Sequence, residues 1–203
     1  MQTPLIVGWG HTPFGKHDAL DLEQLFREAA QPALAMAEVT EADIDGIFVG
    51  TFNAGFVPQD FSATTAALAM PAFRHTPAVR LENACATGSA AIWAALDALQ
   101  SGRMKRVLVV GMEKMNTLPN AQISEVLLKC AYVKEEAGRP GGFAGIFATI
   151  AQAYADRFGD PSDALAQIAA KNHANGARNP WAHLRRDLGY DFCRQVSDKN
   201  PVV

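Results

Sequence analysis

The first 115 residues alternate between short apolar runs and longer segments of helical length. The short runs have the length of strands, and they lie at residues 5–10, 46–52, 78–81 and 105–111. The longer segments lie between them, at residues 18–38, 60–70 and 85–100. The first of these repeats its apolar positions every three or four residues, as an amphipathic helix does. Strands that alternate with helices predict a layered α/β unit with a mostly parallel sheet.

The segment at residues 85–100 has small or apolar residues on almost every side. A surface helix carries one apolar stripe, whereas a helix without a polar face is buried. The next strand, residues 107–110, does not alternate either, and this is typical of a parallel strand covered on both faces. We therefore expect a buried helix between two strands, with Cys85 at its start.

Cys85 occupies a position with chemical consequences. The first N–H groups of a helix have no partner inside the helix, and the helix dipole is positive there, so a thiolate is stabilised. The same N–H groups can hold a developing oxyanion. Position alone leaves two interpretations open. Cys85 is either a nucleophile at the carboxyl end of a strand, where open α/β sheets bind ligands, or a buried structural cysteine.

Residues 116–203 follow a different pattern. They begin as a loop, contain a glycine-rich joint at residues 138–142, and end in a polar, loop-rich stretch. Between these, residues 143–158 predict a helix with Phe143 and Phe147 on one face. A second helix is predicted from a cap around Asp160 to about residue 172 or 175. We therefore divide the chain into domains at residues 1–115 and 116–203.

Composition narrows the class of protein. The chain has 203 residues, and 49% of them are apolar, which is enough for a substantial core. Its net charge of −3 gives no reason to expect a nucleic acid or an anionic membrane as a partner. It has no run of membrane-spanning length and no secretory-signal pattern. Three distant cysteines, Cys85, Cys130 and Cys193, fit neither a disulfide framework nor a zinc site. We expect a cytoplasmic protein with no metal and no covalently bound cofactor.

Two motifs carry a family resemblance: ENACATGS at residues 82–89 and VVGMEKM at residues 109–115. They resemble the N-terminal half of thiolases, and most of all the sterol-carrier-protein-type thiolase and acetyl-CoA acetyltransferase branch. The resemblance covers almost the whole chain. It implies a thiolase-like N-terminal α/β half, followed at residues 116–203 by an inserted helical and loop domain that covers the active site and holds CoA.

The resemblance also implies an activity. Cys85 would attack an acyl-CoA thioester and carry the acyl group, in a Claisen condensation or in thiolysis of a 3-oxoacyl-CoA. His173 lies in KNHANG at residues 171–176, a motif shared with this branch. It faces either the substrate or the backbone of its own helix. Thiolases are generally dimers or tetramers, so we expect self-association, with a separate C-terminal half or a small accessory protein as further partners.

Three thiolase motifs are absent from this sequence. These are the histidine that activates the nucleophile, a second cysteine between glycines, and the motif that holds the oxyanion-hole water. Cys193 has no flanking glycines and does not replace the second cysteine. We expect the final sheet strand and the C-terminal half to be absent, which leaves a helix face and a sheet edge uncovered.

Two classes of function remain open. The chain is either the nucleophile half of a thiolase-type acyltransferase or a noncatalytic thiolase-like scaffold or truncated product. Within the enzymes, a ketoacyl-synthase-like or aldolase-like member of the superfamily is a further alternative.

Overall fold

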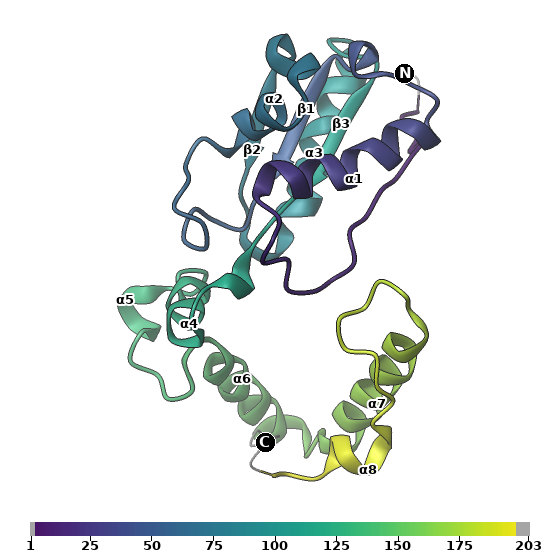
Figure 1. Ribbon diagram of the computed structural model, residues 1–203. Coiled ribbons are helices and arrows are strands. Elements are labelled where there is room, and N and C mark those ends of the chain that lie inside the picture. The colour runs from purple at the N-terminus through teal and green to yellow at the C-terminus, as the bar shows by residue number, and fades with distance from the viewer. Residues whose placement is uncertain (1–2, 198–203) are drawn as a thin grey trace. The chain divides into compact units, whose positions relative to one another are not determined.

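The computed structural model describes residues 3–197, in two compact units (Figure 1). The first unit comprises Lys16–Pro119 together with the segment that ends at Thr12. The second comprises the residues from Asn120 onward together with the short segment Pro13–Gly15. No helix among the described residues is both long enough and apolar enough to cross a bilayer.

Within residues 3–197, the first unit contains a three-stranded parallel sheet in the order β2-β1-β3. The strands are β1 (Gly46–Gly50), β2 (Ala78–Leu81) and β3 (Val107–Gly111). The α-helices are α1 (Leu22–Met36), α2 (Thr65–Ala69) and α3 (Thr87–Gln100). Short 3-10 turns lie between them: η1 (Glu41–Asp43), η2 (Ser62–Thr64), η3 (Pro71–His75), η4 (Ala84–Ala86) and η5 (Met115–Thr117). The predicted parallel α/β unit is confirmed.

Helices cover both faces of this sheet (Figure 1). Ile47 and Val49 of β1 belong to a buried cluster with residues of α1 and α2. Phe48 points to the opposite face and packs against Ala91 and Ala95 of α3. Successive residues of a strand point to opposite faces, so the unbroken apolar run of β1 supplies both layers of the core.

Helix α1 starts with a capping box. The Asp21 carboxylate accepts the Gln24 N–H at 2.7 Å, and the Gln24 side chain accepts the Asp21 N–H at 2.8 Å. Such a cap stabilises a helix by about 1 kcal/mol. The helix therefore starts at Leu22 and not at the predicted Asp18. Pro32 does not split it, although proline removes one hydrogen bond from the helix interior.

The predicted strand at residues 5–10 is not formed. Leu5 and Ile6 are 78% and 88% exposed, and the segment has no regular secondary structure. It lies along α1: a Cβ added at Gly8 or Gly10 would fall 2.2 or 2.0 Å from a backbone oxygen of that helix. A strand needs a neighbouring strand to satisfy its backbone groups, and the described residues place none beside this segment.

Helix α3 is buried on one face only, which corrects the expectation of burial on every side. Ala91 and Ala95 are buried against the sheet, whereas Ile92 and Trp93 are 48% and 71% exposed. An apolar composition indicates that a helix can be buried, but it does not reveal which surface covers each of its faces. Among the described residues of this unit, nothing buries the Trp93 side of the helix.

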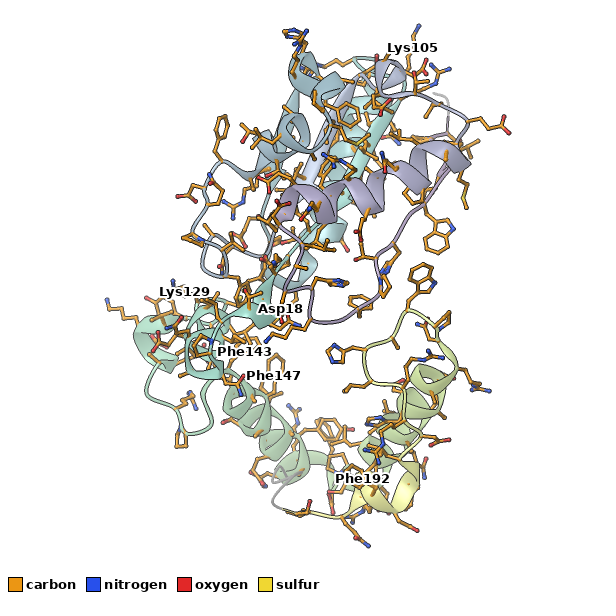
Figure 2. The ribbon with its side chains drawn as sticks, viewed as in Figure 1. Asp18, Lys105, Lys129, Phe143, Phe147 and Phe192 are labelled. Carbon is orange, nitrogen blue, oxygen red and sulfur yellow. The ribbon has the colours of Figure 1, made fainter. Side chains whose placement is uncertain are left out.

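The second unit is helical within the described residues. Its helices are α4 (Asn120–Leu128), α5 (Val133–Glu136), α6 (Gly142–Phe158), α7 (Ser162–Arg178) and α8 (Gly189–Arg194). Phe143 and Phe147 project from the start of α6 with ring centroids 5.2 Å apart, as their spacing predicts (Figure 2). Helix α8 forms where the sequence predicts a loop.

Helix α8 is fixed by long-range bonds to the start of α7. Its Arg194 donates to Asp163 at 2.6 Å, and the Tyr190 hydroxyl donates to the same carboxylate at 3.1 Å. These contacts hold the pKa of Asp163 below its usual range. A pattern of nearby residues does not reveal bonds of this kind, so the sequence alone predicts only a polar loop here.

Candidate active site

Cys85 lies just beyond the carboxyl end of β2, in the 3-10 turn η4 that leads into α3. It is exposed and forms no disulfide. Ligands of open α/β sheets bind at this end of the strands. Among the described residues of this unit, the Cys85 thiol is therefore open to solvent.

The backbone around Cys85 forms a tight turn. Ala84 has a φ of 47°, a left-handed conformation that costs an ordinary residue about 1–2 kcal/mol. Its N–H donates to Glu82 Oε1 at 2.8 Å, and the Ala86 N–H donates to the Asn83 carbonyl at 2.9 Å. The Ala86 N–H is therefore used inside the turn and is not one of the unpaired N–H groups expected at the helix start.

Thr87 stands directly after this turn and is 7% exposed. Its Oγ1 accepts the Asn83 N–H at 2.8 Å and donates to the Ala84 carbonyl at 2.7 Å. The carbonyl of Thr51, which follows β1, lies 3.5 Å from the same oxygen. The hydroxyl thus joins the two residues before Cys85 and approaches the end of the central strand. The sequence places Thr87 in the cysteine motif but does not reveal these contacts.

A second polar cluster lies at the same end of the sheet. Arg80 of β2 donates from Nε to Thr51 Oγ1 at 2.7 Å. Glu113, after β3, accepts the Phe52 N–H at 3.0 Å and the Lys114 N–H at 3.2 Å. Burial raises the pKa of Glu113, although these N–H groups and the Arg80 charge oppose the shift.

A small cavity adjoins this cluster, and Ser62, Arg80 and Glu113 are among the residues that line it. Its volume of about 10 Å³ is comparable to that of one water molecule, so it is too small for an acyl-CoA. The cluster therefore joins the ends of three strands.

The raised pKa of Glu113 predicts a pH dependence of stability. Between its ordinary value of 4.5 and its raised pKa, the folded state binds more protons than the unfolded state, so the free energy of unfolding falls as pH rises. Glu113→Gln is expected to flatten this fall. Urea unfolding between about pH 4 and pH 7 measures it, with exposed Glu28→Gln as the control. Equal slopes in wild type and Glu113→Gln would contradict the prediction.

His173 lies on α7 in the second unit, so the two predicted site residues belong to different units. With Ala169, Asn172 and Leu184 it lines an open cavity of about 250 Å³. His173 therefore borders a hollow that is wide open to solvent, within its own unit.

Comparison with known proteins identifies the family. The family model for the N-terminal domain of thiolase matches residues 5–188. This chain belongs to the thiolase family. The thiolase motifs at residues 82–89 and 109–115 lie inside the matched region, so the predicted resemblance is confirmed.

Two curated relatives show how much of a thiolase-family protein the chain represents. It is 31% identical to the acetyl-CoA acetyltransferase of Methanocaldococcus jannaschii over 204 residues, which cover 100% of this chain and 50% of that protein. It is 27% identical to human sterol carrier protein 2, over 92% of this chain and 35% of that protein. The thiolase-family chain thus spans about half the length, or less, of these curated relatives.

Two solved structures share the thiolase-like fold. The acetyl-CoA acetyltransferase from Syntrophomonas wolfei has a TM-score of 0.59 at 21% identity, over 85% of this chain and 47% of that one. The Ltp2–ChsH2(DUF35) aldolase has a TM-score of 0.68 at 22% identity, over 97% of this chain and 50% of that one. At these identities the likeness bears on the fold, and it confirms the predicted fold class.

Proposed function

We propose that this chain is the nucleophile-bearing half of a thiolase-type acyl-CoA acyltransferase, in which Cys85 carries the acyl group. The observation that supports this most is an exposed, free thiol in a constrained turn at the carboxyl end of a parallel strand. Relatives named acetyl-CoA acetyltransferase, from two organisms, point to the same reaction class.

The proposed reaction has two steps. The Cys85 thiolate attacks the carbonyl carbon of an acyl-CoA, a new C–S bond forms, and the bond to CoA sulfur breaks, so that CoA leaves and takes up a proton. In the second step, a Claisen condensation, the methyl carbon of acetyl-CoA loses a proton and forms a C–C bond to the acyl carbon, and the bond to Cys85 sulfur breaks, which frees the thiolate. Thiolysis of a 3-oxoacyl-CoA is the reverse. We assign no residue of this chain to the proton transfer of the second step.

Substrate binding is the proposed task of residues 116–203, with residues 1–115 as the catalytic α/β domain. His173 is the proposed contact to the CoA thioester, supported by the cavity that it lines on α7. We also propose self-association and a small accessory protein as a partner. The aldolase of shared fold, which is an assembly with a DUF35 protein, supports the latter.

A noncatalytic thiolase-like scaffold is the second candidate function. Relatives named sterol carrier protein 2 and non-specific lipid-transfer protein-like 2 favour it, because these names describe no acyl transfer. The two candidates differ in one observable: a scaffold binds partners without forming an acyl-enzyme, whereas an acyltransferase must form one.

Isotope exchange separates these two functions. The protein is incubated with acetyl-CoA and labelled CoA, and label enters acetyl-CoA only if the acetyl group moves to the protein and back. The acyltransferase proposal predicts exchange that depends on protein concentration, and the scaffold predicts none. A Cys193→Ser variant is the matched control and is expected to exchange like the wild type.

A further inference from the structure

We propose that Thr87 is a positioning residue for Cys85, which sets the reactivity of the thiol by fixing the two residues before it. The idea deepens the proposed function, because it rests on Cys85 as the reacting group. It concerns the thiol itself, however, so it can be tested without any acyl-CoA.

The hydroxyl of Thr87 uses both kinds of hydrogen bond that it can make. It accepts from the Asn83 N–H at 2.8 Å and donates to the Ala84 carbonyl at 2.7 Å. Thr87 is 7% exposed, so water does not readily replace either bond. Loss of the hydroxyl would leave the Asn83 N–H without this partner next to Cys85, whereas the Ala84 carbonyl would keep only the backbone N–H of Thr87.

The conformation of Ala84 explains why the turn needs such support. Its φ of 47° is unfavourable for a residue with a Cβ, and the cost is of the same order as one or two hydrogen bonds. The bonds from Thr87 offset this cost on the carbonyl side, and Glu82 accepts the Ala84 N–H on the other side. Without the hydroxyl, we expect the turn to relax and Cys85 to leave its place before α3.

The methyl group of Thr87 packs close to the end of β1. A Cβ built on Gly50, the last residue of β1, would lie 3.0 Å from Thr87 Cγ2, so the glycine leaves the space that the methyl fills. The Thr51 carbonyl lies 3.5 Å from Oγ1 on the same side. Thr87 therefore lies between the cysteine turn and the end of β1, the central strand of the sheet.

Two substitutions separate positioning from simple stabilisation of the helix start. Thr87→Val keeps the shape of the side chain and removes the hydroxyl, whereas Thr87→Ser keeps the hydroxyl and removes the methyl group. If Thr87→Val does not fold, Thr87→Ala removes the hydroxyl without adding bulk. A purely structural role predicts lower stability for all of these variants, with normal Cys85 chemistry in the molecules that remain folded.

The experiment measures the rate of iodoacetamide alkylation at Cys85 by peptide mass spectrometry, with Cys193 on α8 as an internal reference. Folded populations are matched by circular dichroism. We expect Thr87→Val, or Thr87→Ala, to slow alkylation of Cys85 about tenfold or more, and Thr87→Ser to stay within about threefold of wild type. The Cys193 rate should not change.

Equal Cys85 rates in wild type and the folded variants without the hydroxyl would overturn the proposal, and so would an equal loss in Thr87→Ser. This outcome is independent of the isotope exchange. If the wild type shows no exchange but the alkylation pattern holds, the proposed acyltransferase function fails and the positioning role of Thr87 stands.

Discussion

Phe26→Ala is expected to lower the free energy of unfolding of the first unit by about 3–5 kcal/mol. Phe26 is 0% exposed, and its ring meets that of Phe73 edge-on at a centroid distance of 6.4 Å. Both rings belong to the cluster that covers Ile47 and Val49 of the central strand. Truncation removes apolar contact area and leaves a cavity, and the loss is a large part of a typical domain stability of about 5–15 kcal/mol.

Native-state hydrogen exchange measures this effect for each unit separately. The amides of β1 report on the first unit, and the amides of α7 in the second unit serve as an internal reference. Met36→Ala is the matched control, because Met36 lies on the same helix and is 55% exposed, so its change should stay within about 0.5 kcal/mol. Unchanged protection of β1 in Phe26→Ala would show that this cluster is not the core of the unit.

Cys85→Ser is expected to reduce acetyl exchange roughly 10³-fold or more. Serine has nearly the size of cysteine, so the turn and its bonds to Thr87 can persist. Its hydroxyl stays protonated at neutral pH, however, and is a weak nucleophile unless a base activates it. The same isotope-exchange assay measures the change, with circular dichroism to show that the fold is retained. Exchange at the wild-type rate would remove Cys85 from the mechanism.

The central layers of the fold could be predicted because the sequence encodes them locally. The apolar runs that form β1, β2 and β3 lie within the predicted strands, and the turn before α3 contains Cys85 as expected. Parallel strands that are covered on both faces have a non-alternating apolar pattern. The end of α3 could be predicted from Gly102, which has a φ of 74°.

The errors arose where structure depends on distant partners. The apolar run at residues 5–10 predicts a strand, but a strand forms only where a neighbouring strand pairs with it. The composition of α3 indicates burial, although among the described residues the Trp93 side has no cover. Helix α8 depends on Asp163, which lies 31 residues before Arg194.

One part of the candidate site could be predicted from the sequence, and another part could not. Cys85 could be found from its place between a strand and an apolar helix. The roles of Thr87 and Glu113 could not, because both depend on backbone groups that only folding brings close, such as the Phe52 N–H 61 residues before Glu113. The sequence showed only a threonine two positions after Cys85, among small and apolar residues.

We propose above all that the Cys85 sulfur accepts an acyl group from a CoA thioester. The most direct test of this proposal is to mix the protein with acetyl-CoA, quench with acid, digest, and weigh the peptide that contains Cys85. We expect the mass of one acetyl group on that peptide, none on the Cys193 peptide, and loss of the acetyl group when free CoA is added before the quench. An unmodified Cys85 peptide, or an acetyl group found only at other residues, would contradict it.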